Sequence, residues 1–180
     1  MSKLERITYL CLITLSVLLI GLLIEARLSN RIVAADAQTP TAVALVGKKV
    51  EIPGAAWSFS PLNVVVYLST TCHFCAESMP LYRRLATERH GPAGNAFTLV
   101  AVSAESPKDL LSYLAGQQVE FDSVYQIQLQ NTLLRATPTV LIVDENGIVR
   151  RAAVGKLGAA SEDALLRMVK AGRLKGGVGF

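Results

Sequence analysis

The sequence has few cysteines, few aromatic residues and little net charge, and each shortage excludes a class of protein. Only 3 of its 180 residues are cysteine, so disulfides cannot replace an apolar core as they do in small secreted scaffolds. Aromatic residues make up 6% of the chain, the formal net charge is +4, and the basic residues lack the aromatic neighbours that stack on single-stranded nucleic acid. We therefore expect a core of buried aliphatic side chains and no nucleic-acid partner.

Charged residues are absent from residues 7–24, ITYLCLITLSVLLIGLLI. As a helix this segment would be about 27 Å long, enough to cross the hydrocarbon core of a membrane. We therefore expect residues 1–6 to form a cytoplasmic stub, residues 7–24 a transmembrane anchor and residues 25–41 a tether. The alternative is a cleaved signal peptide with a small-residue pattern at residues 35–37, but the apolar run is longer than a signal peptide requires.

The remaining residues, 42–180, alternate between strand and helix signals, which is typical of a single α/β domain. Two runs of apolar, β-branched residues predict buried strands at residues 63–69 and 96–104. The other predicted features are two short strands turning at Gly47, helices at residues 72–91, 106–118 and 125–135, a hairpin over residues 139–154, a last helix capped by Ser161, and a loose tail at residues 173–180. We expect a central mixed sheet flanked by helices.

Two of the three cysteines, Cys72 and Cys75, lie in the stretch STTCHFCAES. A structural disulfide between them would close too short a loop to restrict the unfolded chain much. A zinc site of the usual kind would need a second cysteine pair, and His73 and His90 are the only histidines. We therefore favour the interpretation that the two cysteines form a redox-active pair. The alternative from another functional class is a copper-delivery module that uses both cysteines and a histidine.

The position of the pair, between a predicted strand and a predicted helix, suggests how it would react. At the start of a helix, backbone N–H groups and the helix dipole favour the thiolate of Cys72. Cys75, one turn further along the same face, would be shielded and able to attack a mixed disulfide formed at Cys72. Cys72 is therefore the predicted nucleophile and Cys75 the predicted resolving thiol.

At this point the chain resembles the thioredoxin superfamily, and in particular its membrane-anchored TlpA and ResA-like thiol-disulfide oxidoreductases. The resemblance covers about residues 42–172 and depends on three features. The cysteine pair follows a strand directly, Pro80 stands five residues after Cys75, and Thr137-Pro138 precedes TVLIVDENG. In the family these positions correspond to the helix-kinking proline and to the cis-proline loop with its following hairpin.

The resemblance implies a thioredoxin-like fold and a protein-disulfide reductase. Thr137 and cis Pro138 would bind an extended segment of the client protein, and His73 and Phe74 would complete the active-site surface. The pair itself would be the redox group, with no cofactor and no metal. The implied setting is the bacterial cytoplasmic membrane, with the domain in the periplasm, a membrane thiol-disulfide protein as electron donor, and cytochrome c maturation as the process. An oxidase or isomerase would use the same residues.

The chain departs from the family pattern at three positions near the pair. Thr71 replaces the tryptophan that commonly precedes the first cysteine, and Val66 stands where thioredoxins have a buried aspartate. The glutamate that often follows the second cysteine by three positions in the ResA-like branch is Ser78, while Glu77 lies one residue earlier. The proton acceptor for Cys75 is therefore left open.

Overall fold

The computed structural model describes Ser16, Ile20 and residues 42–57, 61–89 and 97–172. The chain divides into two compact units, residues 1–39 and 40–180. In the first unit the two described residues are helical. No helix within the described residues is both long and apolar enough to span a membrane. The predicted stub, the rest of the predicted anchor, the tether and the tail at residues 173–180 lie outside the described residues.

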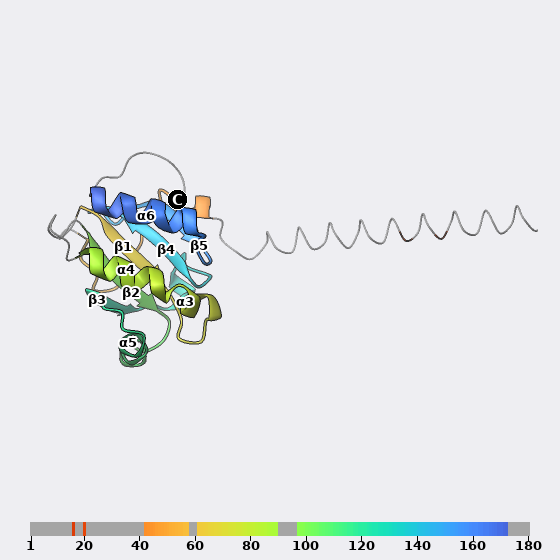
Figure 1. The fold of residues 1–180 in the computed structure, drawn as a ribbon, viewed down its shortest axis with the longest axis horizontal. Coiled ribbons are helices and arrows are strands. Elements are labelled where there is room, and N and C mark those ends of the chain that lie inside the picture. Colours follow the sequence, from red (N-terminus) through yellow and green to blue (C-terminus); the bar gives the residue numbers. More distant parts are fainter. Residues whose placement is uncertain (1–15, 17–19, 21–41, 58–60, 90–96, 173–180) are drawn as a thin grey trace, which may run out of the picture. The chain divides into compact units, whose positions relative to one another are not determined.

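The second unit contains a five-stranded mixed sheet with the order β3-β2-β1-β4-β5 (Figure 1). Strands β1, β2 and β3 are parallel, and β4 and β5 run antiparallel to their neighbours. The strands are β1 (Asn63–Tyr67), β2 (Thr98–Ser103), β3 (Ser123–Gln126), β4 (Thr139–Val143) and β5 (Val149–Val154). The predicted mixed sheet, both buried strands and the hairpin are confirmed.

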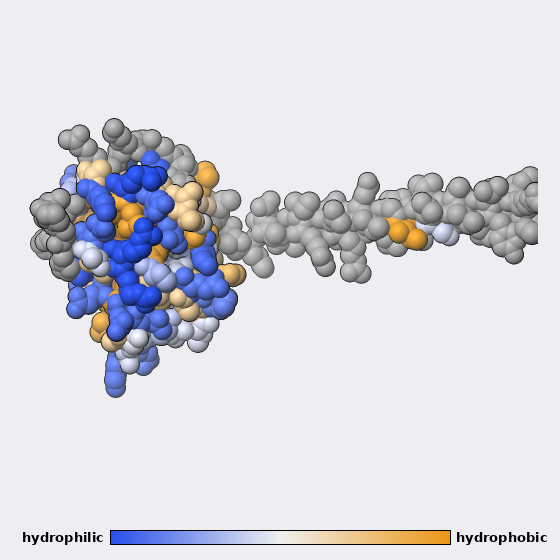
Figure 2. Space-filling view, in the orientation of Figure 1, coloured by the Kyte–Doolittle hydropathy of each residue, from blue (hydrophilic) through white to orange (hydrophobic). Residues whose placement is uncertain are grey.

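Helices follow strands as expected for an α/β domain. They are α2 (Ala42–Leu45), α3 (His73–Glu77), α4 (Met79–Arg89), α5 (Pro107–Gly116), the 3-10 helix η2 (Leu129–Asn131) and α6 (Ala159–Ala171). Helices α4 and α6 cover the same face of the sheet (Figure 1). Their outer surface is largely hydrophilic (Figure 2).

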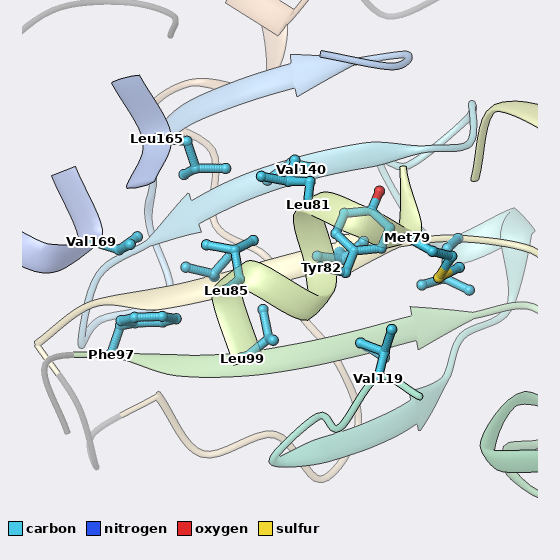
Figure 3. Packing of buried hydrophobic residues seen from close by; sticks show 14 of the residues in the cluster. Met79, Leu81, Tyr82, Leu85, Phe97, Leu99, Val119, Val140, Leu165 and Val169 are labelled. Carbon is cyan, nitrogen blue, oxygen red and sulfur yellow. The ribbon is translucent and has the colours of Figure 1, made fainter. Parts of the chain in front are cut away.

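The sheet is buried on both faces, because successive side chains of a strand point to opposite sides. One cluster packs under α4, α5 and α6; its strand residues include Val64, Val66, Leu99, Ala101, Val140 and Ile142. The close packing of this cluster is visible in Figure 3. The other cluster contains Val65, Tyr67, Val100, Val102, Leu141 and Val143, packed against side chains from residues 42–57 and 127–134. Burial on two sides explains why the strands are continuous apolar runs.

The two short strands predicted around Gly47 are wrong, although the turn is in the right place. Residues before the turn form α2, and Gly47 has a positive φ of 81°. The segment pairs with the β4–β5 hairpin instead of with itself: the N–H of Gly47 donates to the carbonyl of Val149, and that of Val50 to Gly147, both at 2.8 Å.

One predicted helix and the predicted start of another are also wrong. The helix predicted at residues 125–135 is wrong, because residues 123–126 pair with β2 as the parallel edge strand β3 and only η2 follows. The last helix does not begin after Ser161. It begins at Ala159, with Gly158 as its N-cap residue, because two alanines with high helix propensity extend it by part of a turn.

Trp57, the only tryptophan, packs against the turn of the β4–β5 hairpin. Gly147 in this turn has a φ of +79°, and a Cβ atom there would lie 2.8 Å from Cδ1 of Trp57. This contact is at the opposite end of the sheet from the cysteines, since the start of β1 pairs with the end of β4.

Substitution of Gly147 tests this packing. Gly147→Ala should lower the free energy of unfolding by about 1–3 kcal/mol, because alanine is strained at positive φ and its methyl group meets the indole ring. Urea unfolding followed by circular dichroism measures the change. Gly116→Ala, at the end of α5 with open space around it, is the control and should be neutral or slightly stabilising. Equal stabilities for the two variants would contradict the described packing.

Candidate active site

The cysteine pair lies at the junction of β1 and α3, where the sequence predicts it. β1 ends at Tyr67, and Cys72 is the N-cap residue of α3, with φ −82° and ψ 115°. Its Sγ atom accepts a hydrogen bond from the backbone N–H of Cys75 at 3.2 Å. The sulfur thus occupies the place of a serine or aspartate oxygen at a helix start. Both cysteines are free thiols in this structure.

The helix after Cys72 is interrupted at Ser78, which separates α3 from α4. The backbone N–H of Ser78 donates to the carbonyls of Phe74 and Cys75, and its Oγ donates to the Phe74 carbonyl at 2.8 Å. Pro80 follows in the first turn of α4, where it has no N–H to continue the ladder of α3. The cysteines therefore lie at the start of the short helix α3, which is separate from the longer α4.

The pKa values of the two thiols are shifted in opposite directions. Burial would raise the pKa of Cys72, but hydrogen bonds from the side chains of Cys75 and Thr137 and from the first-turn N–H groups outweigh it, so the pKa lies below the ordinary thiol value. Cys75 is fully buried, and burial is the main cause that raises its pKa to about 12. At neutral pH the pair therefore has a reactive outer sulfur and a protonated inner one.

The Thr137–Pro138 peptide is cis and lies beside the outer sulfur, as the resemblance implies. The Cys72 thiol donates to the carbonyl of Thr137, with 3.4 Å between Sγ and the oxygen. The carbonyl of Pro138 accepts from the N–H of Gly155 at 2.7 Å, which fixes the loop to the end of β5. The structure thus brings together four of the six residues predicted for the site, from two separate parts of the chain.

The other two predicted residues, His73 and Phe74, lie on the surface of α3. Nε2 of His73 is 3.1 Å from Oε1 of Glu77, and Nζ of Lys156 is 2.8 Å from Oε2 of the same carboxylate. The hydrogen bond from Lys156 is the main cause that lowers the pKa of Glu77. Phe74 is 55% exposed and contacts the ring of His73. Glu77 therefore ties the pair's helix to the loop after β5.

Glu105 holds the loop between β1 and Cys72, and the sequence analysis did not identify it. Ser69 Oγ donates to its Oε1 at 2.6 Å, and the N–H of Thr70 donates to the same oxygen at 3.0 Å. Glu105 follows β2, the parallel neighbour of β1. A usable signal was therefore present, since the carboxyl ends of neighbouring parallel strands meet at one edge of a sheet.

No metal-binding group of three or more His, Cys, Asp or Glu side chains occurs among the residues that the structure describes. His73 is engaged with Glu77, and His90 lies outside the described residues. A groove of about 770 Å³ lies between residues 49–57 and 126–132, on the other side of the sheet from α4, and none of the predicted site residues lines it.

No protein-family model matches the sequence, and no curated protein shows significant similarity to it. Solved structures do match. A protein from Chlorobium tepidum, described as a thiol:disulfide interchange protein DsbE, has a TM-score of 0.54 at 22% identity, over 71% of this chain and 94% of its own. A thiol-disulfide isomerase from Corynebacterium glutamicum has a TM-score of 0.52 at 13% identity, over 69% and 97%. The chain therefore has the thioredoxin-like fold predicted from its sequence.

The acidity difference predicts how the two thiols react with iodoacetamide. In the reduced protein, modification of Cys72 should titrate with a midpoint below the ordinary thiol pKa of about 8.5, while Cys75 stays unmodified at pH 7. Timed alkylation between pH 5 and 10, with peptide mass spectrometry, measures both. The urea-unfolded protein is the control, in which the two cysteines should react alike. Equal rates in the folded protein at pH 7 would contradict the geometry.

Proposed function

We propose that this protein is a thiol-disulfide oxidoreductase that reduces disulfides of specific client proteins through Cys72 and Cys75. The observation that carries the proposal is the asymmetry of the pair. The Cys72 sulfur caps a helix beside a cis-proline loop and has a lowered pKa, whereas Cys75 is buried with a raised one. The names of the structures with the same fold, thiol:disulfide interchange protein and thiol-disulfide isomerase, support it.

The reaction has two exchange steps. In the first, the Cys72 thiolate attacks one sulfur of the client disulfide; that S–S bond breaks, a mixed disulfide forms, and the other client sulfur leaves and takes a proton. In the second, Cys75 attacks Cys72, the mixed disulfide breaks, and the second client sulfur is released as a thiol. The client gains two electrons and two protons, and the protein retains a Cys72–Cys75 disulfide. The pair is the redox group, and no other cofactor takes part.

The client binds as an extended segment against the cis-proline loop. Thr137 lies within 3.4 Å of the attacking sulfur through its carbonyl, so a segment that pairs with its backbone is held close to Cys72. Phe74, which is 55% exposed beside the pair, provides an apolar contact for the client. Backbone pairing tolerates many sequences, so Phe74 and the neighbouring His73 are the residues that select among clients.

The proposed location is the outer face of the bacterial cytoplasmic membrane. Residues 7–24 form the anchor, the tether follows, and the domain works in the periplasm, where cytoplasmic reductants do not reach it. A membrane thiol-disulfide protein regenerates the dithiol. The apocytochromes of cytochrome c maturation, whose haem-binding thiols must be reduced, are the proposed clients.

A trapping experiment tests the exchange mechanism. Cys75→Ser in the full chain should accumulate a mixed disulfide between Cys72 and its client, because the resolving thiol is missing. Membranes and periplasm from cells making the variant are quenched with acid and alkylated, and the adducts are identified by mass spectrometry. Cys72→Ser is the matched control and should give no adducts. Adducts that are equally abundant in both variants would refute the assignment of Cys72 as nucleophile.

Redox titration tests the direction of transfer. Equilibration with glutathione should give a reduction potential nearer the value of about −270 mV of thioredoxin than the value of about −120 mV of the oxidant DsbA, as a reductase requires. The fraction of disulfide is measured by alkylation and mass spectrometry. A potential at the DsbA end of this range would instead assign the same site to an oxidase.

A further inference from the structure

The position of Cys72 depends on the loop at residues 69–71, which joins β1 to α3. Just before this loop, the N–H of Leu68 still donates to the carbonyl of Val102 in β2, at 3.0 Å. Just after it, the N–H of Cys72 donates to the carbonyl of Ser69 at 3.3 Å. Because the loop lies beyond the paired strands, other hydrogen bonds must fix its conformation, and that conformation decides where the N-cap sulfur lies.

One carboxylate, that of Glu105, gathers the polar groups of this loop. Ser69 Oγ donates to its Oε1 at 2.6 Å, and the N–H of Thr70 donates to Oε1 at 3.0 Å and to Oε2 at 3.2 Å. An ionised carboxylate only accepts hydrogen bonds, so the proton of the Ser69 hydroxyl points to Glu105. A lone pair of Ser69 Oγ then accepts from the N–H of Thr71, at 3.3 Å. Each residue of the loop is therefore fixed by Glu105, directly or through Ser69.

The backbone of Glu105 is itself anchored, between β2 and α5. Its N–H donates at 3.1 Å to Oγ of Ser103, which is fully buried at the end of β2. The next residue, Ser106, is the N-cap of α5, and its Oγ accepts from the N–H of Asp109 at 3.2 Å. A carboxylate anchored on both sides in this way is able to hold a loop in one conformation.

The charge of Glu105 does not explain its place next to the loop of the nucleophile. A negative charge near Cys72 disfavours the thiolate, whereas the exchange reaction needs the thiolate. The hydrogen bonds that reach the sulfur favour the thiolate, and the one from the N–H of Cys75 is 3.2 Å long. These bonds require Cys72 to lie at the helix start, so the useful effect of Glu105 is on geometry.

Building on the proposed function, we propose that Glu105 is a positioning residue of the exchange reaction, which holds the Cys72 sulfur at the start of α3 through Ser69 and Thr70. It takes no proton and does not touch the client. Its two oxygens fix the loop, and the carbonyl of Ser69 in that loop fixes the N–H of Cys72. The reactivity of the nucleophile therefore depends on a residue that follows a different strand of the sheet.

Two conservative variants separate the effect of position from the effect of charge. Glu105→Gln removes the charge but keeps the length of the side chain and an oxygen that can accept from both Ser69 and Thr70. Glu105→Asp keeps the charge but is shorter by one methylene group, so its carboxylate no longer reaches both donors. A positioning role predicts that only Glu105→Asp impairs the nucleophile, and a role through charge predicts that only Glu105→Gln alters it.

The measurement is the pH dependence of iodoacetamide modification of Cys72 in the reduced full chain, followed by peptide mass spectrometry. In Glu105→Asp the midpoint should rise by about half a pH unit or more, because the first-turn N–H groups no longer meet the sulfur in a fixed geometry. In Glu105→Gln it should stay within about 0.2 pH unit of the wild-type value. Amide hydrogen exchange at Thr70, measured by NMR, should become faster in Glu105→Asp alone.

Asp122→Asn is the matched control for a loss of stability. Asp122 also binds the backbone of β2, since its Oδ2 accepts from the N–H of Leu99 at 2.7 Å, and its Oδ1 is 3.1 Å from Nη1 of the buried Arg89. Leu99 lies towards the end of β2 that is away from the cysteines. Asp122→Asn should lower the stability to urea at least as much as Glu105→Asp does, while the Cys72 midpoint stays at the wild-type value.

The outcomes distinguish this inference from the proposed function. A Cys72 midpoint that is unchanged in Glu105→Asp, or that rises as much in Asp122→Asn, would overturn the positioning role and leave the redox pair intact. A lower midpoint in Glu105→Gln, with Glu105→Asp at the wild-type value, would overturn it in favour of a role through charge. A wild-type Cys72 that titrates like a cysteine of the unfolded chain would instead contradict the proposed function.

A second variant decides the question if Glu105→Asp does not fold. Ser69→Ala removes one of the two donors to Glu105 from a partly exposed residue, so it disturbs the core little. It should raise the Cys72 midpoint in the same direction, and an unchanged midpoint in this variant would count equally against the proposal.

Discussion

The hydrogen bond from the backbone N–H of Cys75 to the sulfur of Cys72 is the interaction on which the site depends. It closes the first turn of α3, so the same contact that begins the helix also favours the charged form of the nucleophile. The bond requires α3 to start at Cys72, just past the short loop that follows β1. That start in turn requires the loop between them to be held, which Glu105 does through Ser69 and Thr70.

The division of labour between the two sulfurs follows from one turn of helix. A residue at the N-cap faces the end of the sheet and the cis-proline loop, while a residue three positions later points into the core under α4. Hydrogen-bond donors therefore lower the pKa of Cys72, while burial raises the pKa of Cys75 one turn away.

The correct predictions of helices and strands rested on local signals in the sequence. Ser106 with Pro107 fixed the start of α5, and runs of β-branched residues fixed β1 and β4. The roles predicted for Cys72 and Cys75 followed from their spacing, their place between a strand and a helix and the lack of a second cysteine pair, whereas the cis conformation of Pro138 needed the family resemblance.

The features that the sequence did not predict depend on contacts between residues far apart in the sequence. β3 is a strand because it pairs with β2 at the edge of the sheet, a contact between segments far apart in the sequence. Residues 42–45 form a helix, and the turn after them pairs with the hairpin. Glu105 reaches the site from the loop after β2, so the stretch around the cysteines does not contain it.

The position of Trp57 has a practical consequence for optical work on this protein. Its indole lies against the hairpin turn, at the end of the sheet away from the sulfurs, and it is the only indole in the chain. Quenching of tryptophan emission by a nearby disulfide needs close approach, which this geometry denies. Tryptophan fluorescence will thus change when the fold is lost but not when the cysteines are oxidised. Unfolding and oxidation can therefore be followed separately in one sample.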